Sequence, residues 1–140
     1  MKIGFGFVAL AAILLCAGQV DAKDVKVFVS AAASAPVQRD GFTDLAFPNP
    51  GTRDSAKDIA RVIDGVRGLR TVKRPTDAAV LLQVVSREEQ TGHYLVHVQV
   101  TVQDHRFELT GASIHTWYAS GDDVVGQLNA WVKANRTHFQ

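Results

Sequence analysis

The stretch YLVHVQVTV, residues 94–102, decides the fold class of this chain. Because successive side chains of a β-strand point to opposite faces, an apolar residue at every second position predicts a strand with one apolar and one mostly polar face. Strands of parallel sheets are covered on both faces and favour unbroken apolar runs. The alternation therefore predicts a half-buried antiparallel sheet with this strand at its centre. The apolar positions are Tyr94, Val96, Val98, Val100 and Val102.

The segments on either side extend this strand into a meander. Residues 78–86 (AAVLLQVVS) form a short apolar run rich in Val and Leu, which predicts a buried strand. A polar turn at residues 87–92 leads into the central strand, and the alternation resumes over residues 106–111. Residues 78–111 therefore predict three antiparallel strands joined by short turns.

Two further segments predict helices with one apolar stripe each. The first covers residues 54–67, and the second begins at a cap on Ser120 or Asp122 and ends near Asn135. One stripe per helix and one apolar sheet face fit together if both helices cover that face. The stripe residues are Ile59, Val62, Ile63 and Val66 in the first helix, and Val124, Val125, Leu128, Trp131 and Val132 in the second.

The remaining segments complete the predicted domain. Residues 24–30 alternate and predict a first strand, and residues 69–73 predict a short edge strand. Residues 112–119 either extend the last strand past a bulge or form a loop to the final helix. We predict a single α/β domain over residues 23–140, an α+β sandwich whose mainly antiparallel sheet has four to five strands and two helices packed on one face.

A long connection without periodicity separates the first strand from the first helix. Residues 31–53 hold three of the four prolines, and Asn49-Pro50-Gly51 is a strong turn signal. Connections of this length inside a compact domain are uncommon. The loop is predicted either to form part of a site or to cover the sheet.

The N-terminal segment has the three parts of a secretory signal peptide. Lys2 supplies the positive charge, residues 3–16 are apolar, and Val20-Asp21-Ala22 has the small-x-small pattern of a cleavage site. Residues 1–22 are therefore expected to be removed by cleavage after Ala22, and the protein is expected to be periplasmic or secreted. Two alternatives are an uncleaved anchor and a lipoprotein at Cys16. The apolar run is short for a membrane span, and the residue before Cys16 is Leu, so neither is preferred.

The composition of the remaining chain excludes several classes of site. Cys16 is the only cysteine, so the mature chain is expected to have no disulfide, thiol nucleophile or cysteine-ligated metal. Without Lys2 and Asp21, the 15 Lys+Arg and 14 Asp+Glu become 14 and 13. This near-neutral balance argues against nucleic acid and against an anionic membrane surface as partners.

Several fragments resemble a family of small, secreted and uncharacterised bacterial proteins. The fragments are DSAKDIARVI, VK..TDAAVLLQVVSRE, VQVTVQDHRFELTG and W....DDVVGQLNAWVKANR, which lie within residues 54–136. They consist mainly of core and turn positions and carry no catalytic motif. The resemblance implies a secreted or periplasmic location and an α/β fold, and it implies no activity.

The histidines are the first candidates for chemistry. His93 and His97 lie on the polar face of the central strand, four residues or about 13 Å apart, which is too far to share one metal ion. The chain contains no HExxH or GxSxG motif, and the neighbouring Glu88 and Glu89 diverge in a turn. We therefore expect exposed sheet histidines, no metal and no cofactor.

The aromatic pair before the last helix is the second candidate. Trp117 and Tyr118 lie outside any periodic pattern and close to His115. An exposed pair of this kind is typical of a binding hot spot, whereas a buried pair would pack between the last strand and the last helix.

These observations predict a non-catalytic binding or structural module of the bacterial periplasm or secretome. Its expected partner is an envelope or secreted protein, with no nucleic acid and no membrane span after cleavage. The binding residues are Trp117, Tyr118, His115, His93 and His97. The alternative is a small hydrolase or metal-dependent enzyme that uses the His93/His97 face and the loop of residues 31–53, with acids such as Asp40 or Asp44.

Overall fold

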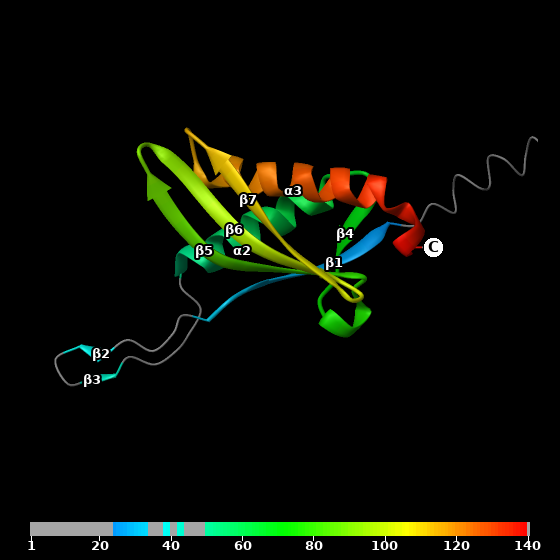
Figure 1. Ribbon diagram of the computed structural model, residues 1–140, viewed down its shortest axis with the longest axis horizontal. Coiled ribbons are helices and arrows are strands. Elements are labelled where there is room, and N and C mark those ends of the chain that lie inside the picture. The colour runs from blue at the N-terminus through cyan, green and yellow to red at the C-terminus, as the bar shows by residue number, and fades with distance from the viewer. Residues whose placement is uncertain (1–23, 34–37, 40–41, 44–49, 140) are drawn as a thin grey trace, which may run out of the picture.

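The computed structural model describes residues 24–33, 38–39, 42–43 and 50–139 (Figure 1). These residues do not include the predicted signal peptide, its cleavage site, Cys16, Asp40 or Asp44. Among the described residues, no helix has the length and apolar character needed to cross a membrane.

The strands are β1 (Val25–Ala31), β2 (Gln38–Arg39), β3 (Phe42–Thr43), β4 (Leu69–Thr71), β5 (Val80–Gln90), β6 (His93–Val102) and β7 (His105–Ser113). The helices are α2 (Pro50–Asp64), α3 (Trp117–Ala134) and the short 3-10 turns η1 (Pro75–Asp77) and η2 (Arg136–Phe139).

Five of the strands form one sheet in the order β4-β1-β5-β6-β7, and β2 pairs with β3 separately. The predicted meander is confirmed, because β5, β6 and β7 pair in antiparallel fashion. The sheet as a whole is mixed, since β1 pairs in parallel with both β4 and β5. A parallel pair needs a crossover connection, and α2 supplies the crossover from β1 to β4. The predicted α+β fold with a mainly antiparallel sheet is confirmed, because the long antiparallel pairs of β5, β6 and β7 join most of the paired residues.

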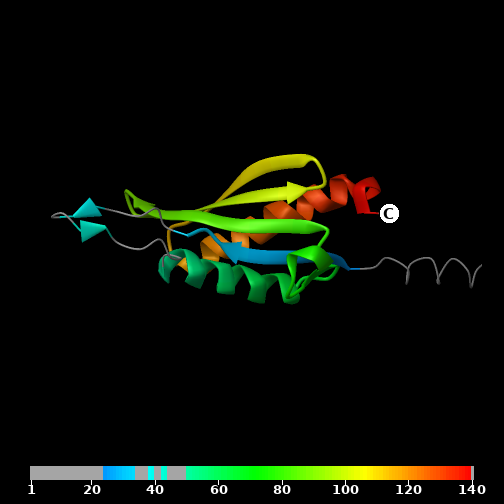
Figure 2. The same cartoon turned by 90° about the horizontal axis from the view of Figure 1, so that it is seen from below.

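The apolar face of β6 forms the centre of the core, as predicted. Its four valines at positions 96, 98, 100 and 102 are at most 1% exposed. Ile59 and Ile63 of α2 and Val124 and Leu128 of α3 belong to the same buried cluster. Both helices therefore cover this face of the sheet, and α2 runs alongside β1 (Figure 2). The opposite face, which we call the open face, carries the polar side chains of β6.

The helix boundaries differ from the predicted ones at both N-termini. α2 begins at Pro50, inside the predicted loop, because proline is well suited to the first turn of a helix. α3 begins at Trp117, and its cap is Thr116, whose Oγ1 accepts a hydrogen bond from the Ala119 N–H at 3.0 Å. Ser120, one of the two predicted caps, is instead fully buried. For residues 112–119 the structure differs from both predicted alternatives, because β7 continues through Gly111 to Ser113 without a bulge and a short loop then leads to α3 at Trp117.

Side chains from the two helices form hydrogen bonds with backbone groups of both outer strands of the sheet. On β4, the Thr71 N–H donates to Asp64 Oδ1 of α2 at 2.9 Å. On β7, the Ala112 N–H donates to Asp123 Oδ2 of α3 at 3.0 Å, and Gln127 Nε2 donates to the Thr110 carbonyl at 2.9 Å. These bonds use groups that would otherwise be open to pairing with another strand.

Candidate functional site

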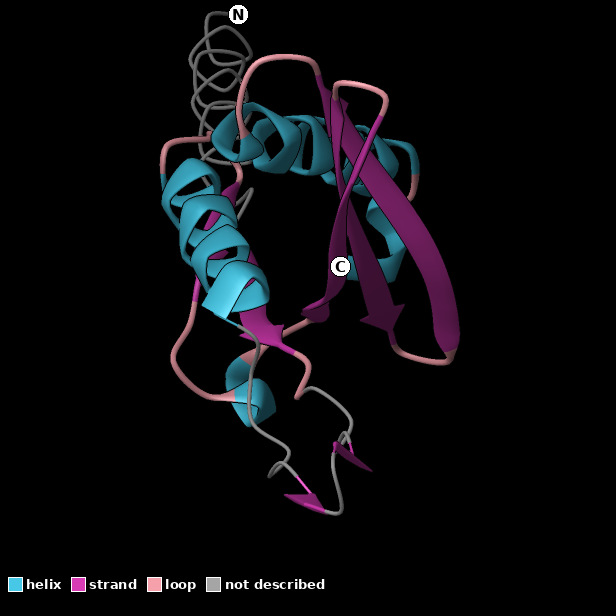
Figure 3. Ribbon diagram, turned by 90° about the vertical axis from the view of Figure 1, so that its left-hand side faces the viewer, coloured by secondary structure: helices cyan, strands magenta, loops and turns pink. Residues whose placement is uncertain are grey.

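Four of the five predicted binding residues gather at one end of the molecule. This end, called the hairpin end here, comprises the β5–β6 turn, the β7–α3 connection and the first turns of α2 and α3 (left in Figure 1; facing the viewer in Figure 3). His93, His115, Trp117 and Tyr118 belong to it. His97 lies further along β6 on the open face.

Trp117 is the centre of a cluster at the hairpin end. The Tyr94 ring meets it edge-on, with 4.9 Å between ring centroids and an interplanar angle of 62°. The Arg87 guanidinium carbon lies 3.8 Å from the centroid of the Trp117 ring. Trp117 is thus half-buried between the sheet and α3, in line with the packing alternative, while Tyr118 is 44% exposed.

Arg87 reaches this cluster because of a β-bulge. The register of β5 against β6 shifts between Val84 and Ser86, so Arg87 pairs with Val96 and points to the helix side of the sheet. Its Nη1 donates to the Gly51 carbonyl of α2 at 2.6 Å. Burial lowers the pKa of Arg87, because removal of water disfavours the charged guanidinium, and the nearby Asp54 and Asp58 carboxylates oppose this shift.

Hydrogen bonds hold the β7–α3 connection in place. Ser113 Oγ accepts from the N–H of His115 at 2.9 Å and from that of Thr116 at 3.4 Å. One turn further on, Ser120 Oγ donates to the Tyr94 carbonyl at 2.6 Å, which ties α3 to β6. The connection therefore presents Ile114, which is 61% exposed, and the adjoining Tyr118 in a defined position. We call these two residues the outer patch.

His97 takes part in a polar contact of its own on the open face. Its Nε2 lies 2.9 Å from Glu88 Oε1, and its Nδ1 lies 2.9 Å from Thr110 Oγ1. The His97 and Glu88 side chains are 32% and 43% exposed. This order of hydroxyl, imidazole and carboxylate is that of a hydrolase triad, but it lies on an open sheet face without the enclosure that strengthens such interactions.

The other candidate groups for catalysis do not join His97. His93 Nδ1 lies 3.3 Å from the Thr91 carbonyl in the β5–β6 turn, and Asp104 lies beyond the other end of β6. The ten residues of β6 separate these two by about 30 Å. Among the described residues, no three His, Cys, Asp or Glu side chains are grouped so as to hold a metal ion.

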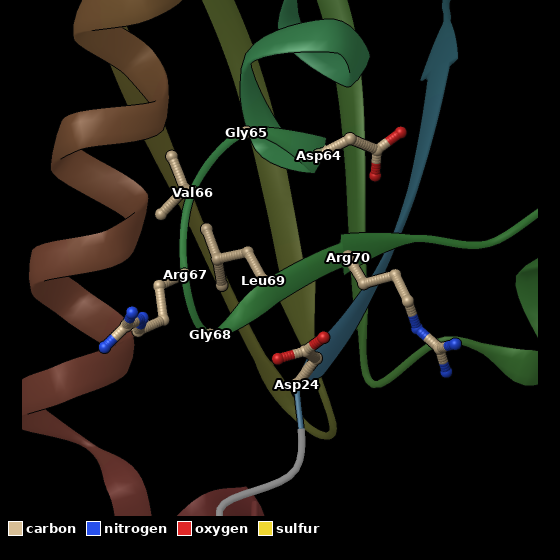
Figure 4. Close-up of a pocket in the computed structure, with 8 residues that line it drawn as sticks. All are labelled: Asp24, Asp64, Gly65, Val66, Arg67, Gly68, Leu69 and Arg70. Atoms are coloured by element: carbon tan, nitrogen blue, oxygen red, sulfur yellow. The ribbon is translucent and has the colours of Figure 1, made fainter.

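A pocket of ≈ 520 Å³ lies at the opposite end of the molecule, where α2 leads into β4 (Figure 4). Its two arginines, Arg67 and Arg70, point away from one another. The Asp64 carboxylate is held by the Thr71 hydroxyl at 2.9 Å. The pocket therefore has no convergent set of donors for an anion.

The exposed face of α2 carries a row of basic side chains that the net charge of the chain does not indicate. Arg53, Lys57 and Arg61 follow one another at intervals of four residues and are all exposed, and we call them the basic stripe. On the same helix, Asp54 and Asp58 act on Arg87, and Asp64 is bonded to β4. The four-residue spacing is visible in the sequence and could have identified the stripe.

Solved structures of low sequence identity align with this chain. No family model matches the chain, and no curated protein matches it. A ribosomal subunit interface protein from Coxiella burnetii aligns with a TM-score of 0.44 at 11% identity, over 81% of this chain and 99% of that one. The Protein Y N-terminal domain of Thermus thermophilus aligns with a TM-score of 0.41 at 18% identity, over 80% and 97%. The hypothetical protein CT253 from Chlamydia trachomatis aligns with a TM-score of 0.44 at 10% identity, over 81% and 100%.

These results correct several expectations from the sequence. One of these neighbours is named a ribosomal subunit interface protein and another Protein Y, which contradicts the resemblance to a secreted family and the periplasmic or secreted location, including the Cys16 lipoprotein alternative. The same finding overturns the expected envelope or secreted partner, the exclusion of nucleic acid, and the function as a periplasmic module with its hydrolase alternative. At such low identities and TM-scores, the likeness itself assigns this chain no activity and no partner.

Proposed function

We propose that this chain is a non-enzymatic module that docks a partner protein at its hairpin end. The observation that carries the proposal is the outer patch of Ile114 and Tyr118, held beside the stacked pair of Arg87 and Trp117. Aromatic residues and arginine dominate the hot spots of protein interfaces. Contiguous apolar surface with a polar rim marks protein–protein interaction sites, whereas apolar residues exposed singly do not.

The rigidity of the site supports docking. Ordering a loop or a side chain on binding costs free energy, which a preorganised site avoids. The hydrogen bonds of Ser113, Thr116 and Ser120 already order the β7–α3 connection. The backbone bonds made by Asp64 and Asp123 disfavour the other common route, in which a partner adds a strand to a sheet edge.

The arrangement of the polar side chains favours binding over catalysis. A general base acts on a substrate held within hydrogen-bonding reach, usually in a concave site. His93 and His97 instead lie in the first half of β6, and Asp104 lies beyond its other end. The proposal accordingly assigns no reaction to the open face.

Site-specific photo-crosslinking in cells tests the docking proposal. The photo-reactive amino acid p-benzoylphenylalanine is introduced at position 118, at position 114 and, as a control, at the exposed position 130 in the C-terminal half of α3. We expect one discrete protein adduct from positions 114 and 118 and none from position 130. An additional Trp117→Ala substitution should abolish the adduct at 118, because it removes the support of the patch.

Two outcomes would contradict the proposal. One is the absence of any protein adduct at positions 114 and 118. The other is an equal yield of the same adduct at position 130, which would show collision without a specific interface. Thermal unfolding of each variant separates a lost interface from a lost fold.

A second candidate function, nucleic-acid binding, rests on the basic stripe of α2. Arg53, Lys57 and Arg61 are spaced by about 6 Å along the helix, and cations in such a row suit a phosphate backbone. An interfacial membrane helix would need an exposed apolar face, whereas the apolar face of α2 is buried. Duplex RNA is the first probe, with duplex DNA beside it, because both present a continuous row of phosphates.

Fluorescence anisotropy at several salt concentrations tests the second candidate. The triple variant Arg53→Gln, Lys57→Gln and Arg61→Gln is compared with a variant of equal charge, Arg106→Gln, Lys133→Gln and Arg136→Gln. If the stripe binds RNA, only the first variant should lose affinity, and the slope of log K against log salt should fall by about 0.9 for each lost contact. Equal losses in both variants would mean that binding reflects total charge alone and would reject the stripe.

A further inference from the structure

We infer that the docking site takes a carboxylate on Arg87, so that its partner presents an acidic side chain next to an apolar one. This inference rests on the proposed docking function and specifies the chemistry of the partner. The ligand class is an acidic peptide segment in which Asp or Glu adjoins a residue such as Leu.

The Arg87 guanidinium is partly buried, and its close contacts among the described residues include no carboxylate. Its one hydrogen bond among the described residues goes to the Gly51 carbonyl, a neutral acceptor. The ion pairs found within 4.0 Å among these residues are Arg74–Asp77 and His97–Glu88, so no described carboxylate contacts Arg87. A partly buried charge is stable when a counter-charge pairs with it, and Asp54 and Asp58 act only from a greater distance.

The stacking on Trp117 orients the guanidinium for such a partner. With the guanidinium carbon 3.8 Å above the ring, one flat face of the group is covered. The N–H donors of arginine lie in the plane of the group and form a fork that matches the two oxygens of a carboxylate. A lysine at this position would keep the charge but would lose the stacking and the fork.

The first turns of two helices favour an anion beside Arg87. The charged side chains at this end do not add to that preference, because Arg53 and Lys57 balance Asp54 and Asp58, and Glu88 and Glu89 follow Arg87 on β5. The first turn of α2 and the first turn of α3 contain no acidic residue, and both begin at the hairpin end. The positive ends of the two helix dipoles therefore add to the charge of Arg87.

The outer patch supplies the apolar part of the same site. Tyr118 follows Trp117 directly in α3, and Ile114 lies at the start of the connection that leads to it. A carboxylate on Arg87 would therefore bring the adjoining part of its peptide next to Ile114 and Tyr118. An acidic residue beside an apolar one fits both contacts.

A titration of the full-length protein followed by NMR tests the inference with a defined probe. The probe is 4-methylpentanoate, which joins a carboxylate to a branched apolar chain, and its neutral control is 4-methylpentanamide. We expect the carboxylate to shift the Arg87 Nε–H and Trp117 indole N–H signals, with half-saturation at about 1–10 mM for so small a ligand. The Trp131 indole signal, at the other end of α3, should not move.

Variants complete the test. Arg87→Lys should abolish the shift at Trp117, whereas Arg106→Lys, which alters an exposed arginine on β7, should leave it unchanged. Equal shifts with the amide and the carboxylate, or no shift with wild-type protein up to about 100 mM probe, would overturn the inference without recourse to any variant. A carboxylate that shifts Trp131 as strongly as Trp117 would also reject it.

The outcome is distinguishable from that of the docking proposal. If crosslinks at position 118 persist while the carboxylate has no effect, the docking function stands and its acidic partner is rejected. If the carboxylate binds but no protein crosslinks at positions 114 and 118, the docking function is rejected and the inference about its partner falls with it.

Discussion

Gly111 lies where β7 passes beneath the first turns of α3. A Cβ atom at this position would lie 2.0 Å from the Ser120 carbonyl oxygen and 2.7 Å from a methyl group of Val124. Cβ atoms do not come this near to backbone atoms in real proteins. Only glycine at position 111 therefore allows α3 to pack at this distance from β7. This contact also places Ser120 within reach of the Tyr94 carbonyl and thereby positions Trp117.

Gly111→Ala should therefore destabilise the protein by about 3 kcal/mol, because α3 must move away from the sheet. The matched control is Gly126→Ala, a position on α3 where an added Cβ meets nothing within 4 Å. That substitution should stabilise the protein by about 0.5–1 kcal/mol through helix propensity. Urea unfolding of both variants measures the difference, and equal stabilities would show that α3 tolerates displacement from β7.

Arg87 illustrates the limit of sequence patterns at the scale of one residue. In the sequence it opens a polar turn after an apolar run, and nothing in that pattern indicates contact with Trp117, thirty residues later. The bulge after Val84 turns it to the helix side, where the pattern without a bulge would have placed Ser86. One unpaired residue in β5 thus changed which side chain reaches the candidate site.

The two helices act on the sheet edges as well as on its face. Asp64 of α2 and Asp123 of α3 each accept a hydrogen bond from the N–H of an outer strand, and Gln127 adds a bond to the β7 carbonyl of Thr110. Exposed edge strands invite pairing with other chains, and natural proteins block them in several ways. In this protein carboxylates from the covering helices contribute to that protection.

Asp123→Ala should uncover part of the β7 edge. Asp123 accepts hydrogen bonds from the Ala112 N–H and from Gln127 Nε2, both of them exposed, and their loss should cost about 1 kcal/mol. The freed N–H of Ala112 should favour self-association. Asp122→Ala is the matched control, because Asp122 is exposed and has the same charge. Light scattering after size-exclusion chromatography at high protein concentration measures association. If the Asp123→Ala variant stays monomeric at the same protein concentrations as Asp122→Ala, Asp123 does not protect the edge.

At the scale of the whole molecule, the distribution of charge matters more than its sum. The formal net charge of the chain is +1, and this near-neutral value led to the exclusion of nucleic acid as a partner. The structure separates the charges of α2, with the basic stripe exposed and the acids turned to Arg87 or to β4. A total charge carries no information about such a separation, because it discards position.

The sequence by itself determined the α+β class, the meander, the apolar face of β6 and the apolar stripes of both helices. These features follow from side-chain periodicity, which is a local property of the chain. It also singled out Trp117 and Tyr118, whose role in binding stays a proposal.

Only the tertiary structure decided the parallel pairing of β1, the start of α2 within the predicted loop and the contact of Arg87 with Trp117. It likewise placed Asp104 away from His93 and His97, beyond the other end of β6, and it added hydrogen bonds from Asp64 and Asp123 to the edge strands. Each of these features depends on which segments, distant in the sequence, come into contact. A bulge or a crossover changes those contacts without leaving a periodic signal in the sequence.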